Sequence, residues 1–358
     1  MSPLRTLTLA LTATAVTFGC GNDDPTNDEI IIDTAQREAR AQYDANVAFA
    51  TSYAPKCTSG SGMTQRVLVT GFGRWQSSAR NPSGLLVSAL VPAAKYPVTA
   101  PPPAHQVDPP GPQLSVGKKT FFLPKSGSVE VCAMVVPTHW DLAAFLIAKE
   151  IASFKPSLVL MNGMAYPRQT LQFELGARNR AGIAPAADGL SPAPAVGSTD
   201  APLIATAPAS EFGRPNLMSW NAVRRSALET IAKNKAVPGQ NGAFDTVLLG
   251  ASFNRFPDPT NDFVCNNTTY VVGYLMDHPQ PTKLMEASVP LRGKTNSLTL
   301  ALPSGFENAP RDFLHWPSTL EGAQIGAAAE VLAAVIDAQL KATKDGDAPT
   351  RGDNSIAD

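Results

Sequence analysis

The sequence has no excess of one charge sign and has few of the residues that build metal sites or disulfide scaffolds. Its 29 Lys and Arg residues nearly balance its 30 Asp and Glu residues, for a formal net charge of -1. This balance argues against nucleic acid or an anionic membrane surface as the main partner, because both select for clustered basic side chains. Four cysteines in 358 residues exclude a disulfide-dense scaffold. Because the sequence has no Cys/His metal spacing, Walker loop or dinucleotide fingerprint, we expect no cofactor.

Apolar residues make up 44% of the chain, enough for a substantial core, and they are accompanied by 26 glycines and 32 prolines. The prolines, alanines and serines gather in a few segments. Residues 92–118 and 184–213 are two of these, and the prolines of the first argue against any regular element there. We therefore predict one domain over 65–343 with Pro-rich insertions at 92–118 and 184–213. A tether and lead-in at 21–64 precede it, and a polar tail at 344–358 follows.

The start of the sequence, residues 1–20, predicts an export signal. Arg5 is the one positive charge before an apolar stretch, Leu7–Phe18, that is too short to span a bilayer. Gly19-Cys20 follows, and a small residue before a cysteine resembles the bacterial lipobox, in which the cysteine is lipidated. The two residues before Gly19 depart from the usual pattern, so an ordinary secretory signal is the alternative. We expect export from a bacterial cytoplasm and anchoring to a membrane through Cys20, on the periplasmic side or at the cell surface, or else free secretion.

Short apolar strands alternate with helices along the rest of the chain. Strands are expected at Arg66–Thr70, Val129–Val136, Leu158–Met161, Phe244–Leu249 and Ser297–Leu302, with an extended segment at Leu171–Arg178. Helices are expected at Ile32–Ala50, Asn81–Leu90, Trp140–Phe154, Leu217–Lys235 and Thr319–Leu340, and from Asp262 or Phe263 to Met276. This alternation predicts an α/β fold of three layers, α/β/α, around a mainly parallel twisted sheet. Ligands of such folds bind beyond the carboxyl ends of the strands.

Cys265 is the best candidate nucleophile, because it lies at a predicted helix N-terminus, where the partial positive charge favours a thiolate. Bases are scarce, since the chain has four histidines. His315 lies between Leu and Trp just before a long helix, and it is the candidate base. His105 falls in a Pro-rich loop, His139 precedes a helix, and His278 follows a helix end, where a histidine is often a cap. Taken singly, each of these residues also has an ordinary structural interpretation.

Four segments, in order, carry more information than any single residue. They are Thr70-Gly71-Phe72 with Asn81-Pro82-Ser83; Gly163-Met164-Ala165-Tyr166-Pro167-Arg168 with Glu174, Ala177 and Asn179; Phe263-Val264-Cys265-Asn266 with Tyr270; and Phe313-Leu314-His315-Trp316-Pro317. Together they resemble the pyroglutamyl peptidase I family of cysteine exopeptidases, also called pyrrolidone-carboxylate peptidases, over roughly residues 66–340. The chain would be a divergent member with insertions.

The resemblance implies roles for these residues. Cys265 would be the nucleophile, His315 the base and later the acid, and Glu174 the group that orients the imidazole. An ion pair with Arg168 is the structural alternative for Glu174. Phe72, Trp75, Met164 and Phe263 would line the pocket for a pyroglutamyl ring, since aromatic walls bury a small neutral lactam. Core packing is the alternative for the aromatic residues.

Some positions depart from the family pattern. Thr260, Asn261 and Asp262 replace an Ala-Gly-Thr-like turn, and Asp262 either adds a negative charge near the thiol or caps the helix. Ala184 replaces an arginine near the oxyanion, and Arg178 or Arg180 are the candidate substitutes.

Three functions follow as hypotheses. The first is a cysteine exopeptidase that removes N-terminal pyroglutamate from peptides. The second is a related thiol hydrolase acting on another small acyl or lactam group. The third is a catalytically silent, peptide-binding surface lipoprotein. The expected partners are peptides with N-terminal pyroglutamate, with no nucleic acid and membrane contact only through the lipid anchor. A homo-oligomer and a Cys57–Cys132 disulfide are left open.

Overall fold

The computed structural model describes residues 44–356, except 61, 63–64, 76–79, 100–108, 141, 166–167, 181–201, 205, 257, 259–260, 262 and 285–297. The expected export signal with Cys20, most of the tether, and the positions Ala184 and Asp262 lie outside the described residues.

One mixed sheet forms the centre of the molecule, with the strand order β11-β5-β14-β4-β1-β3-β2. Four parallel neighbours make its middle: β14 (Arg311–Pro317), β4 (Leu158–Ala165), β1 (Arg66–Phe72) and β3 (Gly127–Val136). On one side, β5 (Leu171–Glu174) is antiparallel to β14 and parallel to β11 (Ala251–Asn254). On the other side, β2 (Ser115–Leu123) is antiparallel to β3. The expected α/β fold with a mainly parallel sheet is confirmed.

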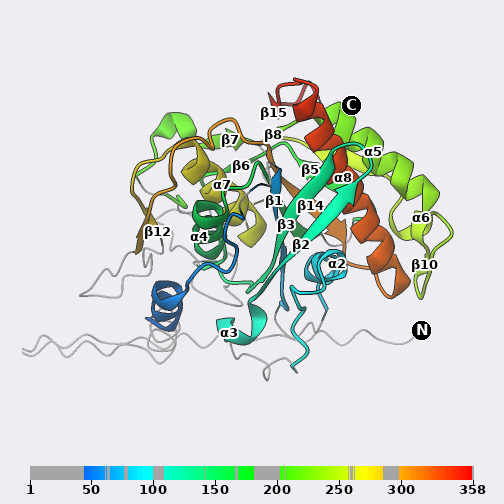
Figure 1. Cartoon of the computed structure of the whole chain (residues 1–358), viewed down its shortest axis with the longest axis horizontal. Helices are drawn as coiled ribbons and strands as arrows, with labels where there is room; N and C mark the ends of the chain where they lie inside the picture. The colour runs from blue at the N-terminus through cyan, green and yellow to red at the C-terminus, as the bar shows by residue number, and fades with distance from the viewer. Residues whose placement is uncertain are drawn as a thin grey trace, which may run out of the picture.

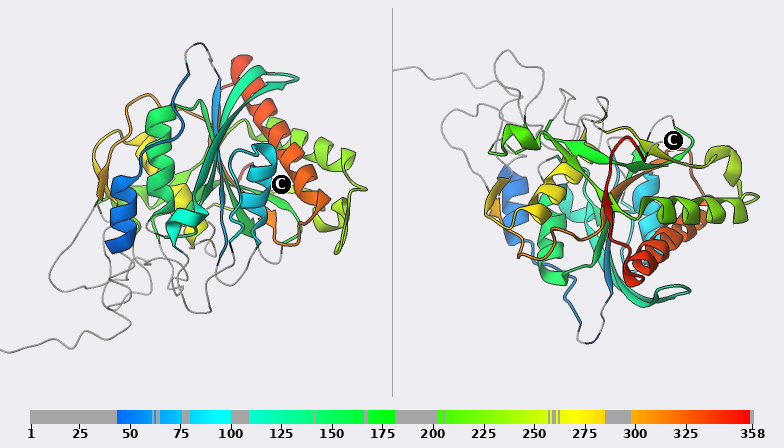
Figure 2. Two further views of the ribbon diagram at one scale, coloured as in Figure 1. Left: turned by 60° about the horizontal axis from the view of Figure 1, so that its bottom comes forward. Right: turned by 90° about the horizontal axis from the view of Figure 1, so that it is seen from above.

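Helices cover both faces of this sheet (Figures 1 and 2). The first face carries α4 (Ala143–Phe154), α7 (Val264–Asp277) and a helical segment at 44–52. The second face carries α2 (Pro82–Leu90), α5 (Trp220–Lys233) and α8 (Ala323–Lys344). Asn81 caps α2 by accepting a hydrogen bond from the Ser83 N–H at 3.1 Å.

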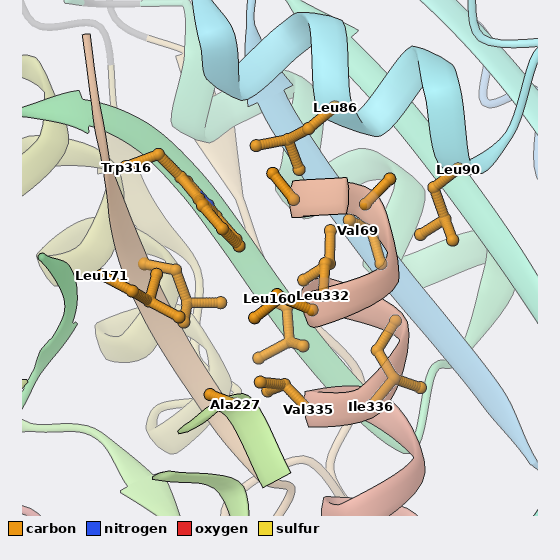
Figure 3. Close-up of a cluster of buried hydrophobic side chains, with 14 of the residues drawn as sticks. Val69, Leu86, Leu90, Leu160, Leu171, Ala227, Trp316, Leu332, Val335 and Ile336 are labelled. Carbon is orange, nitrogen blue, oxygen red and sulfur yellow. The ribbon is translucent and has the colours of Figure 1, made fainter. Parts of the chain in front are cut away.

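Two hydrophobic cores follow from the three layers. The core under α2, α5 and α8 holds Val69, Leu86, Leu160, Trp316 and Leu332, shown in Figure 3. The core under α4 and α7 holds Phe72, Met134, Ile147, Tyr270 and Phe313. Among the described residues, α8 is the one helix long and apolar enough to cross a membrane, and 72% of its apolar window is buried inside the protein, as in the core helix of a globular domain.

Smaller elements complete the described part of the chain. They are α3 (Pro110–Gln113), β6 (Gly176–Arg178), η1 (Ala209–Glu211), β7 (Gly213–Pro215), β8 (Leu217–Met218), β9 (Pro238–Gly239), β10 (Gly242–Ala243), α6 (Phe244–Val247), β12 (Thr282–Leu284), β13 (Leu298–Leu300) and β15 (Thr350–Arg351). β15 pairs with β8, and β8 with β14, so the end of the polar tail returns to the main sheet.

Two predictions about elements were wrong. Residues 92–118 do hold regular structure: the short helix α3 lies at Pro110–Gln113, and β2 begins at Ser115, after the last proline of the segment. β2 is an edge strand with an exposed Lys-rich middle, so it lacks the apolar pattern of a buried strand. The strand expected at Phe244–Leu249 is instead helix α6, whose Phe244 and Val247 are buried one helical turn apart. The strand of this region is β11, which begins at Ala251, four residues after the last residue of α6.

A disulfide joins Cys57 in the lead-in to Cys132 in β3, with a Cα–Cα distance of 6.1 Å. Glu150 of α4 lies beside it and accepts hydrogen bonds from the N–H groups of Lys56, at 2.7 Å, and Cys57, at 2.9 Å. It also accepts one from the Tyr53 hydroxyl. Burial, with the Glu150 carboxylate, raises the pKa of Tyr53. The lead-in is therefore fastened to the first face of the sheet.

Candidate active site

The candidate nucleophile Cys265 is the second residue of α7 and is half-buried. Phe263 is the N-cap, with extended backbone and no side-chain cap hydrogen bond. The interpretation of Asp262 as the N-cap was therefore wrong. Because a phenyl ring is no conventional hydrogen-bond acceptor, the N-cap side chain satisfies none of the first-turn N–H groups of α7. The sequence placed Cys265 at a helix N-terminus, and this placement is confirmed.

The start of α7 is held by the two asparagines that follow the cysteine. Asn266 accepts a hydrogen bond from the Arg178 N–H at 2.8 Å and donates to the carbonyl oxygens of Arg178, at 2.9 Å, and Arg180, at 2.8 Å. Asn267 donates to the carbonyl oxygen of Trp140. These side-chain bonds fix Cys265 in space although the N-cap is apolar.

Gly163 makes room for the thiol. It lies in β4, in register with His315 of the neighbouring strand β14. A Cβ atom at Gly163 would lie 3.0 Å from the Cys265 Sγ and 2.6 Å from the Phe313 Cε1. Both contacts are too close for a side chain. Glycine at this position therefore allows the sulfur to lie directly against the strand that neighbours the histidine.

His315 is buried, and the Glu174 carboxylate and the Cys265 thiol are its two acidic neighbours. Its Nδ1 lies 2.5 Å from the Oε1 of Glu174, on the antiparallel strand β5. Because a carboxylate only accepts, this contact fixes Nδ1 as the donor and leaves Nε2 for the thiol. Burial lowers the pKa of His315, but the charges and hydrogen bonds of Cys265 and Glu174 outweigh it and raise the pKa to about 10. The structure thus brings the Glu174 carboxylate, the His315 imidazole and the Cys265 thiol together in that order.

Glu174 has a second partner that the sequence did not reveal. Asn254, at the end of β11, donates its Nδ2–H to the same Oε1 at 2.5 Å. Arg168 donates to the Asn254 Oδ1 at 2.9 Å and to the Gln172 Oε1 at 2.8 Å. The alternative of a direct ion pair between Glu174 and Arg168 is therefore not what the structure has. No sequence signal identified Asn254, because its strand was expected elsewhere.

Asp312 is a further buried carboxyl behind the site. Burial raises the pKa of Asp312 well above its usual range, and the Glu174 charge adds to this, against hydrogen bonds from the Phe313 N–H and Asn216. Asn216 donates to the Asp312 Oδ1 at 3.0 Å and to the Glu174 carbonyl oxygen at 2.7 Å. Asn216 thus links the backbone of β5, at Glu174, to the Asp312 side chain of β14, the strand that carries His315.

Aromatic rings surround the start of α7. Phe263 makes edge-to-face contacts with Trp75, at 5.6 Å between centroids, and with Trp140, at 5.1 Å. Trp75, Met164 and Phe263 are half-buried. Phe72 is 3% exposed and packs 6.3 Å from Phe313, in the core behind the site. Sequence reasoning missed Trp140.

The turn before the nucleophile contains an arginine contact. Arg178 is buried, and its Nη2 donates to the Asn261 carbonyl oxygen at 3.4 Å. Of the two arginines considered as substitutes near Ala184, Arg178 thus lies beside this turn, and Arg180 contributes its carbonyl oxygen to Asn266.

A metal site is not suggested by the described residues. Their one group of close candidate ligands is Cys57, Cys132 and Glu150. Both sulfurs are joined in the disulfide, and the carboxylate oxygens accept hydrogen bonds from Tyr53, Lys56 and Cys57. This donor set therefore holds the lead-in and does not fit a metal ion.

No family model and no curated protein matches the sequence. Several solved structures are similar. Pyroglutamyl peptidase I from Bacillus amyloliquefaciens is 17% identical and has a TM-score of 0.44, covering 77% of this chain and 96% of that chain. Pyrrolidone carboxyl peptidase from Thermococcus litoralis is 14% identical, with a TM-score of 0.45 and coverage of 79% and 96%. A mutant of the Pyrococcus furiosus enzyme is 14% identical, with a TM-score of 0.46 and coverage of 78% and 100%. This similarity is too distant to assign an activity, so we infer the function from the site.

Proposed function

We propose that the protein is a thiol hydrolase in which Cys265 forms an acyl-enzyme. The observation that carries this is the 2.5 Å contact between Glu174 Oε1 and His315 Nδ1, with Cys265 close enough to the same imidazole to raise its pKa. Such a nucleophile, base and orienting carboxylate are the parts that acyl transfer to a side chain needs.

The chemistry follows from these positions. His315 takes the proton of the Cys265 thiol at Nε2, the sulfur attacks the substrate carbonyl carbon, and the first-turn N–H groups of α7 donate to the oxyanion. His315, protonated at Nε2, gives this proton to the leaving amine as the carbon–nitrogen bond breaks. Water then attacks the thioester carbon and gives a proton to His315, the carbon–sulfur bond breaks, and the acid product leaves as His315 returns the proton to the Cys265 sulfur. Glu174 holds the imidazole with Nδ1–H toward itself throughout.

The finer part of the proposal is the substrate, a peptide with N-terminal pyroglutamate. Two observations support it. The half-buried rings of Trp75 and Phe263 lie beside the nucleophile and suit a small neutral lactam. The four segments described above resemble those of pyroglutamyl peptidases, with Glu174, Cys265 and His315 at the matching positions.

Hydrolysis of a fluorogenic pyroglutamyl amide tests this function. We expect release of the fluorophore under reducing conditions, and its loss in Cys265→Ser and in His315→Ala. Ser252→Ala, on the neighbouring strand β11, is the control and should keep the activity, since the Ser252 Oγ pairs with the Thr170 Oγ, away from the thiol. No release by the wild type, or release that survives Cys265→Ser, would contradict the proposal.

The second candidate is a related thiol hydrolase for another small acyl or lactam group. Trp75 favours it, because it is half-buried in edge-to-face contact with Phe263 and would give the pocket a different shape. A panel of acyl amides with rings of different size distinguishes the two. The first function requires that the pyroglutamyl amide has the highest kcat/KM.

We also propose that the protein is exported and held at a membrane through Cys20. The Cys57–Cys132 disulfide supports export, because disulfides persist in oxidising compartments. Cell fractionation with mass spectrometry of the mature N-terminus tests this. A cytoplasmic protein with an intact N-terminus would contradict export, and a free N-terminus in the medium would contradict anchoring.

A further inference from the structure

Asn254 lies between Glu174 and Arg168, with a hydrogen bond to each. It is the last residue of β11, directly opposite Glu174 in the parallel pair with β5. It is 7% exposed, and its Nδ2 lies 2.5 Å from Glu174 Oε1, the oxygen that also receives His315 Nδ1. The other oxygen, Oε2, has no hydrogen-bond partner in the described part of the chain. The orientation of the carboxylate therefore depends on the two donors at Oε1.

Chemistry fixes which way the Asn254 amide points. Its oxygen faces Arg168 Nη1, at 2.9 Å, and its nitrogen faces Glu174. A guanidinium only donates and a carboxylate only accepts. A flipped amide would set oxygen against oxygen at one end and N–H against N–H at the other. Arg168, held in turn by Gln172 at 2.8 Å, thus keeps the donor side of Asn254 toward Glu174.

The amide also keeps a cation at a distance. Arg168 in direct contact with Glu174 would neutralise the carboxylate and compete with His315 for it. Because a neutral amide lies between them, Glu174 gains a second hydrogen bond while its charge remains directed at the imidazole. This arrangement explains why the arginine near the site does not form an ion pair with Glu174.

We propose that Asn254 is a positioning residue that holds the Glu174 carboxylate against His315, with Arg168 fixing the direction of its amide. This inference rests on the proposed thiol chemistry but on no particular substrate. Loss of the amide lets the carboxylate rotate away from Nδ1, which destabilises the imidazolium and, through it, the charge-separated pair with the thiol. The measurable consequence is a change in the pH dependence of Cys265 reactivity.

The test is the rate of Cys265 alkylation by iodoacetamide between pH 4 and 10, which needs no substrate. We expect Asn254→Ala to slow alkylation at neutral pH by about tenfold or more, as for other partners that orient a histidine. The half-maximal rate should also move to higher pH. Asn254→Asp should show a larger shift, because it sets a second carboxylate against Glu174. Arg168→Met should show a smaller shift in the same direction, since the amide stays but can flip.

Ser252→Ala is the matched control, because it removes a side-chain contact across the same two strands, at 3.2 Å from Thr170. Its alkylation profile should match the wild type within twofold.

A profile of Asn254→Ala that matches this control would overturn the positioning role while leaving the thiol chemistry intact. If Asn254→Ala does not fold, Arg168→Met decides, and an unchanged profile there overturns the inference. A wild-type Cys265 that is inert at every pH overturns both the proposed function and this inference. Alkylation that shifts as expected, without hydrolysis of pyroglutamyl amides, upholds the inference and refutes only the substrate.

Discussion

The two ends of helix α7 are built in opposite ways. At its C-terminal end, about 20 Å from the cysteine by helix geometry, Asp277 receives Arg311 Nη2 on both carboxylate oxygens at 2.7 Å and also contacts Arg214. His278 follows, with its Nε2 at 2.8 Å from Glu211. At the N-terminal end, beside the Cys265 thiol, the N-cap is the apolar Phe263, whose side chain makes no cap hydrogen bond. The difference shows that the chain pairs its charges at the end of the helix that lies away from the thiol, and uses no side-chain cap from Phe263 at the end that carries it.

The largest expected effect is on catalysis at the N-terminal end. Glu174→Gln should lower kcat by about 10⁴-fold, because a glutamine cannot stabilise the imidazolium and can present its N–H to Nδ1. The thermal unfolding temperature should change little, since the side chain keeps its size. Steady-state kinetics with the best amide substrate, together with a melting curve, measure both. A loss of less than tenfold would contradict the orienting role of Glu174.

The opposite result is expected at the C-terminal end. Asp277→Ala leaves the guanidinium of Arg311, whose side chain is 0% exposed, without its carboxylate. The free energy of unfolding should fall by about 3–5 kcal/mol, and kcat of the folded fraction should stay within about twofold. Urea denaturation measures the first and kinetics at low temperature the second. Lys233→Ala, which breaks the exposed pair with Glu330, is the control and should change stability by about 0.5 kcal/mol or less.

Gly163→Ala should lower the rate of hydrolysis by changing the packing at the N-terminal end of α7. The new methyl group would displace the Cys265 sulfur and the Phe313 ring, and a misplacement of about 1 Å can cost about 10²-fold in rate. Overpacking should also lower the free energy of unfolding by about 1–3 kcal/mol. Gly326→Ala in α8 is the matched control, since nothing lies within 4 Å of its Cβ position, and it should be neutral or slightly stabilising. Equal activity of the two variants would contradict the close approach of Gly163 to the thiol.

A further effect is expected on the pH dependence of stability. Because the pKa of His315 is raised from 6.5 to about 10, its contribution is fully present below pH 6.5 and is lost as the pH rises to about 10. The wild type should therefore lose more stability over this interval than His315→Ala, and its amide hydrolysis should decline as the pH approaches 10. Denaturation curves at pH 6.5, 8 and 10 compare the two proteins. Parallel curves would contradict the raised pKa.

The α/β fold and most of its elements could be predicted from the sequence, because buried strands such as β4 contain continuous apolar runs, here Leu158–Met161. Edge strand β2 could not be, since half-exposed positions carry no such pattern. The helix α6 was mistaken for a strand because a short apolar run fits both elements, and only tertiary packing decides between them.

Some residues of the candidate site could likewise be identified from the sequence, and others could not. Cys265, His315 and Glu174 were identified because their residue types are rare or stand in recognisable segments. Asn254 and Trp140 were not, because their importance lies in contacts made across strands and helices far apart in the sequence. The network at Asp277 gave no sequence signal, since arginines and carboxylates are common on any surface.

Affinity labelling tests the central claim, a reactive Cys265 beside a lactam pocket, most directly. The wild type would be treated with a pyroglutamyl chloromethyl ketone or, for comparison, with an acetyl-alanyl chloromethyl ketone, and digested for mass spectrometry. The account predicts one label per chain, on Cys265, formed much faster with the pyroglutamyl reagent and slowed by Glu174→Gln. Equal rates with the two reagents would contradict the lactam pocket, and labelling that avoids Cys265 would contradict the nucleophile.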